Sequence, residues 1–291
     1  DVLEKAGMVR VNLPSAGVDY IVPFGGRKGS SHRPCEQESY TREFYTQCKD
    51  KLYLNLETEL KTMSPKLYNG IWPVAPTPFM PTGEVDYDSM LRVLDLMLDQ
   101  GVDGICILAN FSEQFLISDE EREKLMRVSL EKVAGRVPVI VTISHFATEI
   151  AVARARLAKL LGASMVMMMA PYHGALLKGT AQQTYEQVEA VGAVGIPIMI
   201  QDAPLSGVEL PVPLLVKMAT NIEMVKLFKI ECAGAAAKLR DLIAAGGEAI
   251  EGPFDGEEAI TLMADLDAGA SGSMTSALIP DLIGPVIRTY L

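Results

Sequence analysis

The chain has 291 residues, and 49% of them are hydrophobic, which suits one large domain or two small ones. A formal net charge of −11 without a basic run disfavours a nucleic-acid partner, and no apolar run approaches the ~20 residues of a membrane span. The four cysteines are scattered, and with the three histidines they show no metal-ligand spacing. We therefore expect a cytoplasmic protein that binds no metal, no nucleic acid and no membrane.

Residues 1–65 differ in character from the rest and predict an irregular N-terminal extension. Their glycine-rich stretch at 25–29 lacks the spacing of a phosphate-binding loop, so its glycines indicate a turn. Three segments resemble the C-terminal tail of an aldehyde dehydrogenase of the 2-oxoglutarate semialdehyde type, at 7–12, 23–30 and 43–46. In that family the nucleotide-binding domain and the nucleophilic cysteine precede this tail, so the resemblance implies a non-catalytic fragment.

From residue 66 to residue 291, apolar segments alternate regularly with helical ones. The predicted strands lie at 71–77, 103–108, 138–143, 164–169, 197–201, 224–230, 248–251 and 270–275. Between them, Ser118 and Glu121 predict a capping box at the start of one helix. Thr148 can cap the next helix, and Gly162 ends it.

Eight strands, each followed by a helix, predict an α/β fold, namely a parallel (β/α)8 or TIM barrel. A doubly wound open sheet is the alternative, but no G-x-G-x-x-G follows the first strand. The predicted barrel at 66–291 is shorter than the ~250 residues typical of this fold, so we expect it to be truncated at its C-terminus.

The sixth predicted strand carries two lysines within a buried apolar segment. Because side chains alternate along a strand, Lys226 and Lys229 point to opposite faces. Lys229 is the better candidate for the inward position, since Glu231 shares its face where the strand meets the following loop. Burial lowers the pKa of a lysine, and a neutral amine forms a Schiff base with a ketone. A lysine that extends its amine to solvent at a strand edge is the alternative.

Polar side chains follow most of the predicted strands, at the end of the barrel where such folds place their active sites. They are Asn110, Phe111, Ser112 and Glu113 after the second strand, Ser144 and His145 after the third, Tyr172 and His173 after the fourth, Gln201 and Asp202 after the fifth, Glu231 after the sixth, and Glu251, Gly252 and Asp255 after the seventh. Taken singly, each can be explained by helix capping or turn formation.

Several segments resemble the dihydrodipicolinate synthase and N-acetylneuraminate lyase superfamily. They are Pro-Thr-Pro-Phe at 76–79, Gly-Glu-Val-Asp at 83–86, Gly-Arg-Val-Pro-Val-Ile at 135–140, and the strand that holds Lys229. In that family a lysine captures the C2 carbonyl of a 2-keto acid, and the loop after the second strand binds the substrate carboxylate. The resemblance implies a Schiff base at Lys229, a small 2-keto acid substrate and no cofactor. Because the family is commonly tetrameric, it also implies a homo-oligomer.

The chain departs from the family pattern at two places. Asn110, Phe111 and Ser112 replace the loop threonines, although an amide and a backbone N–H near the serine can still donate to a carboxylate. Gln201 replaces the tyrosine that relays protons at the end of the fifth strand. An amide cannot act as a general acid or base near neutral pH, so the relay must come from elsewhere, with Tyr172, His173 and Glu231 as the candidates.

These departures resemble one subgroup of the family, the L-2-keto-3-deoxyarabonate dehydratases of L-arabinose catabolism. This resemblance implies a hydro-lyase that forms 2-oxoglutarate semialdehyde and water. The implied catalytic residues are Lys229, Tyr172 and His173, and the implied substrate contacts are Asn110, Phe111, Ser112, Gln201, Glu231, His145 and Gly252.

Other functions remain open at this point. An aldolase that releases pyruvate would use the same lysine, whereas a dihydrodipicolinate synthase lacks support because its strand-five tyrosine is missing. A non-catalytic barrel that binds a keto acid, or an inactive truncated one, is a different class of alternative. The semialdehyde is also the substrate of the dehydrogenase that residues 1–65 resemble, which suggests that a frameshift or a gene-calling artefact joined the two pieces.

Overall fold

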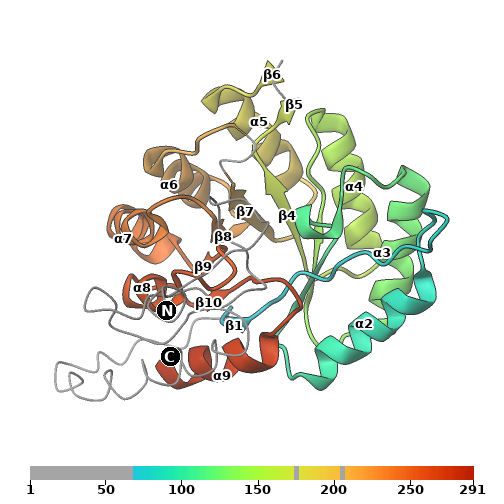
Figure 1. Ribbon diagram of the computed structural model, residues 1–291. Helices are drawn as coiled ribbons and strands as arrows, with labels where there is room; N and C mark the ends of the chain where they lie inside the picture. Colours follow the sequence, from blue (N-terminus) through green and yellow to red (C-terminus); the bar gives the residue numbers. More distant parts are fainter. Residues whose placement is uncertain (1–67, 174–176, 204–206) are drawn as a thin grey trace, which may run out of the picture. The chain divides into compact units, whose positions relative to one another are not determined.

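The computed structural model describes residues 68–173, 177–203 and 207–291, so the predicted aldehyde dehydrogenase-like segment 1–65 lies outside the described residues. Among the described residues, eight parallel strands form one sheet in the order β1-β10-β9-β8-β7-β4-β3-β2 (Figure 1). They are β1 Gly70–Ile71, β2 Ile105–Ile107, β3 Val139–Thr142, β4 Met165–Met169, β7 Ile198–Asp202, β8 Val225–Ile230, β9 Gly252–Asp255 and β10 Gly272–Ser273.

The two edges of this sheet meet at Val74. This residue forms one parallel bridge with Cys106 of β2 and another with Ser276, which follows β10. The N–H of Ala75 also donates to the carbonyl of Cys106 at 2.8 Å. The ring of strands is therefore closed, and the predicted (β/α)8 barrel is confirmed.

A helix follows each barrel strand and packs on the outside of the ring (Figure 1). The helices are α2 Tyr87–Asp99, α3 Asp119–Val133, α4 Thr148–Leu160, α5 Ala181–Gly192, α6 Val212–Asn221, α7 Ala235–Gly246, α8 Leu262–Asp267 and α9 Pro280–Tyr290. The predicted capping box of Ser118 and Glu121 opens α3, whereas α4 begins at Thr148 with Ala147 as its N-cap. No helix in the described part of the chain is both long and apolar enough to cross a membrane.

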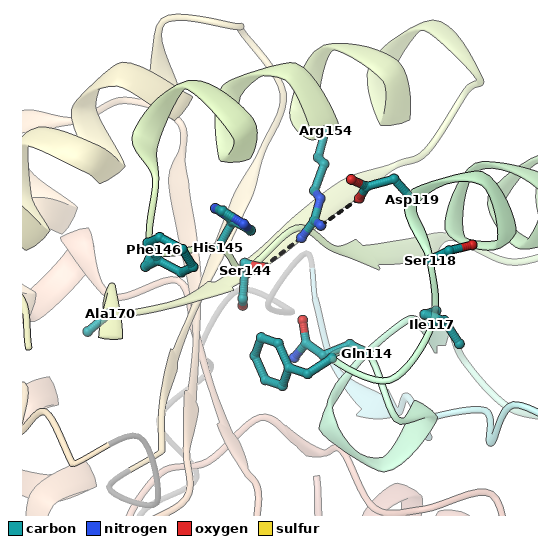
Figure 2. Close-up of a pocket in the computed structure, with 10 residues that line it drawn as sticks. Gln114, Ile117, Ser118, Asp119, Ser144, His145, Phe146, Arg154 and Ala170 are labelled. Atoms are coloured by element: carbon teal, nitrogen blue, oxygen red, sulfur yellow. Dashed lines mark hydrogen bonds and ion pairs between the residues drawn. The ribbon is translucent and has the colours of Figure 1, made fainter. Parts of the chain in front are cut away.

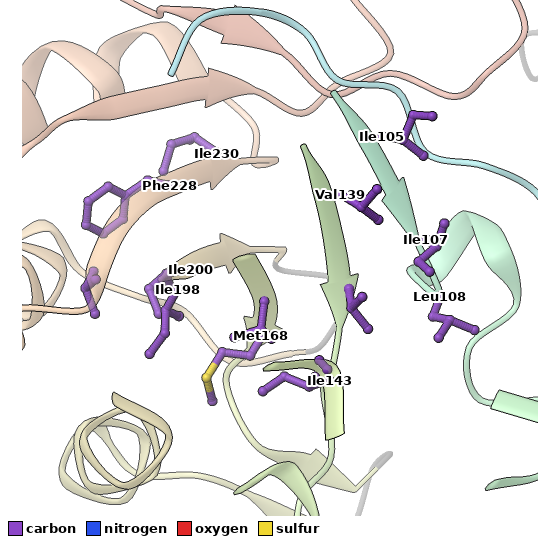
Figure 3. Close-up of a cluster of buried hydrophobic side chains, with 14 of the residues drawn as sticks. Ile105, Ile107, Leu108, Val139, Ile143, Met168, Ile198, Ile200, Phe228 and Ile230 are labelled. Carbon is purple, nitrogen blue, oxygen red and sulfur yellow. The ribbon is translucent and has the colours of Figure 1, made fainter. Parts of the chain in front are cut away.

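Alternation along the strands produces two separate apolar cores. The outer core lies between the strands and the helices and includes Ile200 and Phe228 (Figure 3). The inner core fills the barrel with side chains that include Met167, Met199 and Leu227. The methionine-rich strand β4 contributes to both cores.

The seventh strand of the barrel begins later than predicted. The segment predicted as a strand at 248–251 contains part of the short helix η5 Gly247–Ala249, and the strand is β9 Gly252–Asp255. Gly252 and Pro253 read as a turn in the sequence because both residues are disfavoured in strands. Here Gly252 pairs with Leu227, and a Cβ at Gly252 would lie only 2.2 Å from the Leu227 side chain. Close packing inside the ring therefore requires this glycine.

Replacing Gly272 by alanine is expected to weaken the closure of the barrel. A Cβ at this position would lie 2.3 Å from the carbonyl oxygen of Gly70, in the strand to which Gly272 is paired. Backbone atoms cannot move aside as a flexible side chain can, so we expect the free energy of unfolding to fall by about 1–3 kcal/mol. Urea denaturation measures this loss. The exposed change Glu223→Ala is the control, and an unchanged midpoint for Gly272→Ala would contradict the prediction.

Candidate active site

Lys229 lies inside the ring of strands. It belongs to β8, where Leu227 faces the inner core and Phe228 and Ile230 face the outer one, so Lys229 shares the inward face with Leu227. Only 5% of Lys229 is exposed. Lys226 instead forms an ion pair with Glu251 at 2.9 Å, at the amino end of β8. The two lysines are thus separated by their position along β8. Regular alternation does not account for this, because Val225 lies in the outer core and Leu227 in the inner one, where the register between β7 and β8 shifts.

The amine of Lys229 contacts a carboxylate that is itself held by an amide. Nζ of Lys229 lies 3.0 Å from Oε2 of Glu231, and Nε2 of Gln201 donates to the same oxygen at 2.7 Å. Gln201 pairs with Lys229 in the register of β7 and β8, and the N–H of Glu231 donates to the carbonyl of Asp202. We call Lys229, Glu231 and Gln201 the lysine cluster.

One oxygen of this cluster has no partner. Gln201 is 1% exposed, and within the described residues its Oε1 is buried and accepts no hydrogen bond. A buried polar atom without a partner costs free energy, typically ~1–3 kcal/mol. The amide oxygen of Gln201 therefore lies buried without a hydrogen bond that would offset this cost.

Two residues that the sequence analysis did not select lie inside the ring near Lys229. The thiol of Cys106 is 3.7 Å from the hydroxyl of Thr142, and both side chains are buried. Burial raises the pKa of the Cys106 thiol to about 11, although the positive charge of Lys229 acts in the opposite direction. Because the thiol stays protonated near neutral pH, it cannot serve there as a base. Strand alternation alone, counted from Ile140 to Thr142, could have located Thr142.

Gly256 is a third residue missed by the sequence analysis. It follows β9, and a Cβ at this position would lie 3.0 Å from Cγ and Cε of Lys229 and from Cβ of Glu231. The glycine therefore provides the surface on which the stem of Lys229 rests. It was missed because the seventh strand was predicted several residues too early.

The loop after β2 forms the short helix η3 Asn110–Ser112. The Asn110 amide donates to the Met169 sulfur at 3.4 Å and accepts from Gln114 at 2.6 Å. Met169 pairs with Gln201 in the sheet, which places Asn110 beside the carboxyl ends of β4 and β7. The Phe111 side chain is 43% exposed.

Ser112 supports this loop from within. Its hydroxyl donates to the carbonyl of Ala75 at 2.6 Å and accepts from the N–H of Ala109. The N–H of Ser112 donates to the carbonyl of Ala109, and Ser112 is only 1% exposed. Both donors of Ser112 are thus used within the protein, and its predicted contact with the substrate stays a prediction.

His145 lines a cavity between the loops that follow β2, β3 and β4 (Figure 2). Its Nδ1 accepts from the N–H of Ala147 at 2.9 Å, and its ring stacks on Phe146. Burial, with a further contribution from the charge of Arg154, lowers the pKa of His145. The cavity has a volume of about 300 Å³ and is lined by Gln114, Phe115, Ile117, Ser118, Asp119, Ser144, His145, Phe146, Arg154 and Ala170. No member of the lysine cluster lines it, so His145 is not brought together with Lys229.

Gly252 and the catalytic candidates after β4 differ in their position along the barrel. Gly252 is the first residue of β9 and lies at the amino end of the ring, so its predicted contact with the substrate is wrong. Tyr172 and His173 form strand β5, which follows β4 directly and pairs with β6 Leu177–Lys178. Only their backbone is described, so their catalytic roles stay predictions.

Two buried carboxyl groups meet between β9 and α8. Asp255 accepts from the Ser273 hydroxyl at 2.6 Å, and Asp265 accepts from the Thr261 hydroxyl at 2.6 Å. Burial, together with the neighbouring charge of Asp255, raises the pKa of Asp265 to about 7. Asp265 therefore keeps its proton in the folded protein up to a higher pH than an exposed aspartate does.

Asp265→Asn is expected to change how stability depends on pH. In the wild type the folded carboxyl keeps a proton that the unfolded chain loses near 3.8, so stability falls as the pH rises from there to about 7. Asparagine does not titrate, and its amide can donate to Asp255. The melting temperature of the variant minus that of the wild type should therefore increase as the pH rises over this range. A constant difference would contradict the prediction, and Asp241→Asn at an exposed position is the control.

Comparisons with known proteins agree on one family. The model of the Dihydrodipicolinate synthetase family matches residues 67–289. The chain is 57% identical to L-2-keto-3-deoxyarabonate dehydratase from Azospirillum brasilense over 224 residues, which cover 77% of this chain and 72% of that protein. It is 29% identical over 218 residues to 4-hydroxy-tetrahydrodipicolinate synthase from Aquifex aeolicus, covering 74% of this chain and 72% of that protein. The crystal structure of dihydrodipicolinate synthase from Aquifex aeolicus superposes with a TM-score of 0.71 at 27% identity, covering 77% and 75% of the two chains.

Proposed function

Because the chain belongs to the Dihydrodipicolinate synthetase family, we propose that it is an L-2-keto-3-deoxyarabonate dehydratase that acts through a Schiff base on Lys229. The observation that carries this proposal is the amine of Lys229, which lies inside a closed barrel and contacts a carboxylate. The 57% identity to a dehydratase of this name supports the choice of substrate.

The first half of the reaction builds the Schiff base. The Lys229 amine, after losing a proton, attacks the C2 ketone of the 3-deoxy-2-keto acid, and the C2 oxygen leaves as water. The resulting iminium withdraws electrons from C3. Because the iminium provides this polarisation, the proposed reaction needs neither a metal nor a cofactor.

The second half eliminates the C4 hydroxyl. Removal of a C3 proton gives an enamine, whose electrons return through C3 and break the C4–O bond to release water. Loss of a C5 proton and protonation at C3 give the enol of the C5 aldehyde. Protonation at C4 with loss of the enol O–H proton gives the aldehyde, and hydrolysis of the iminium releases 2-oxoglutarate semialdehyde and free Lys229. We assign protonation of the leaving hydroxyl to His173, because an ordinary histidine pKa of ~6.5 suits transfer near neutral pH, and the relay that builds the Schiff base to Tyr172.

The substrate is held by groups at the carboxyl ends of the strands. The first N–H groups of a helix have no partner within it, so those of Asn110 and Phe111 at the start of η3 can donate to the substrate carboxylate, as can the Asn110 amide. The free Oε1 of Gln201 can accept a hydrogen bond from a substrate hydroxyl. We also propose that the enzyme works in the cytoplasm as a homo-oligomer, as the family resemblance implies.

A product assay tests the proposed function. Incubating the protein with L-2-keto-3-deoxyarabonate should produce 2-oxoglutarate semialdehyde, which ¹³C NMR distinguishes from pyruvate. Release of pyruvate would instead identify an aldolase that cleaves the C3–C4 bond. Unchanged substrate would favour a binding protein without catalytic activity.

A further inference from the structure

We propose that Glu258 is a positioning residue for Lys229, and that it acts by holding the turn after β9 in a strained backbone conformation. This proposal rests on the proposed function, since it names the group that keeps the nucleophile of that reaction in place. Glu258 lies two residues beyond Gly256, on which the stem of Lys229 rests. We call residues 256–259 the β9 turn.

The β9 turn contains two consecutive residues in the left-handed region of backbone conformation. The φ angles of Glu258 and Ala259 are +52° and +62°. Residues with a Cβ adopt this region at a cost in free energy, because the Cβ lies close to the following carbonyl oxygen. No other two adjacent non-glycine residues in the described part of the chain have positive φ. Such a conformation persists only where contacts with the surroundings fix it.

The Glu258 carboxylate provides a contact that fixes this turn. Its two oxygens accept from the N–H of Ser276 at 3.0 and 2.9 Å. Ser276 follows β10 and forms a parallel bridge with Val74, at the place where the barrel closes. Hydrogen bonds that involve a charged group are stronger than neutral ones. The carboxylate therefore ties the turn to the backbone of the closed ring rather than to a flexible side chain.

The two ends of the β9 turn are held by other means. At its start, the N–H of Gly256 donates to the carbonyl of Ile230 at 3.1 Å, at the end of β8. At its end, Ala259 is 1% exposed and packs in the outer core. Glu258 thus fixes the strained step between a hydrogen-bonded start and a buried end.

The position of the turn determines where the stem of Lys229 can lie. A Cβ at Gly256 would be 3.0 Å from Cγ and Cε of Lys229, so the backbone there leaves no room for a side chain beside the stem. If the turn relaxed, this support would withdraw and the amine would gain freedom. Attack on a carbonyl needs the reacting atoms about 3–3.5 Å apart and aligned, so added freedom slows Schiff-base formation. In this account Glu258 acts through the turn and not on the substrate, so its loss affects kcat rather than KM.

Glu258→Ala and Glu258→Gly form a matched pair that tests this role. Both remove the carboxylate and its charge, but only glycine adopts positive φ without strain. For Glu258→Ala we expect kcat to fall by ~10-fold at nearly unchanged KM, because losing a hydrogen bond to a charged group shifts an equilibrium by about that factor. Glu258→Gly should recover most of this loss, to within about threefold of wild type, since the strain at this residue is relieved. The rate of adduct formation on Lys229 with pyruvate, quenched by borohydride, should follow kcat.

A double variant tests whether Glu258 acts through Gly256. Residues that act through one contact give effects that do not add, so Gly256→Ala with Glu258→Ala should lose less than the product of the two single losses. Because Glu258 is exposed, its variants leave no cavity and should fold, which circular dichroism checks. Glu258→Gln replaces the alanine variant if that one does not fold.

Two results would overturn the proposal. The first is wild-type kcat in Glu258→Ala. The second is an equal loss in Glu258→Ala and Glu258→Gly, which would show that the negative charge matters and the backbone conformation does not. Absence of an adduct with the wild-type protein would instead refute the proposed function.

Discussion

Lys229→Met is expected to abolish dehydration, with a loss in kcat/KM of at least ~10⁴-fold, because the covalent route has no other nucleophile. Methionine has an unbranched, adaptable side chain that can occupy the space of the lysine stem inside the ring. The barrel should therefore remain folded while the Schiff base cannot form. Steady-state kinetics with the 3-deoxy-2-keto acid and circular dichroism on the same samples measure both consequences.

Lys226→Met is the matched control for this experiment. It removes the same side chain from the same strand, but at the amino end, where Lys226 pairs with Glu251 rather than with a group of the lysine cluster. Partly exposed ion pairs of this kind contribute ~0–1 kcal/mol, so we expect kcat/KM within about threefold of wild type. Substantial activity in Lys229→Met, or equal losses in the two variants, would show that Lys229 is not the nucleophile.

Gly256→Ala is expected to lower kcat, by less than the ~10²-fold that a misplacement of about 1 Å at a reacting group can cost, because contacts at 3.0 Å require a shift of only a few tenths of an ångström. The new methyl group would lie 3.0 Å from two carbons of the Lys229 stem and from Cβ of Glu231, so it must displace the lysine cluster. Because Gly256 does not contribute a side chain to substrate binding, the loss should fall on kcat more than on KM.

Gly284→Ala controls for the general cost of a tight contact. Its added Cβ would also lie 3.0 Å from its neighbours, but these are Arg288 and Ile71 rather than Lys229. We expect this variant to keep the wild-type kcat, with any loss confined to stability. If Gly256→Ala retained full kcat, the stem of Lys229 would not depend on this contact.

The alternation of side-chain direction along the strands was the most reliable basis for predicting site residues from the sequence. Lys229 was predicted to face inward because Glu231 shares its face where the strand meets the following loop, and the structure shows both side chains beside Gln201. The same reasoning failed where strand boundaries were hidden. Gly252 and Pro253 concealed the start of β9, and with it the contact of Gly256 against Lys229.

Contacts between distant segments could not be predicted from sequence. The hydroxyl of Ser112 donates to the carbonyl of Ala75, 37 residues earlier in the chain, a contact that neither the residue type nor the family resemblance reveals. His145 follows its strand as predicted, but it stacks on Phe146 in a cavity that the lysine cluster does not line. Both outcomes depend on where loops fold back, which local patterns do not encode.

The central claim is that the amine of Lys229 forms a covalent bond with the C2 carbon of a 2-keto acid inside the barrel. Borohydride reduction of the protein with substrate, followed by peptide mass spectrometry, tests this claim most directly. We predict one stable adduct, located on Lys229 in the peptide that contains β8. An adduct on another lysine, or unmodified protein after reduction at saturating substrate, would contradict the claim.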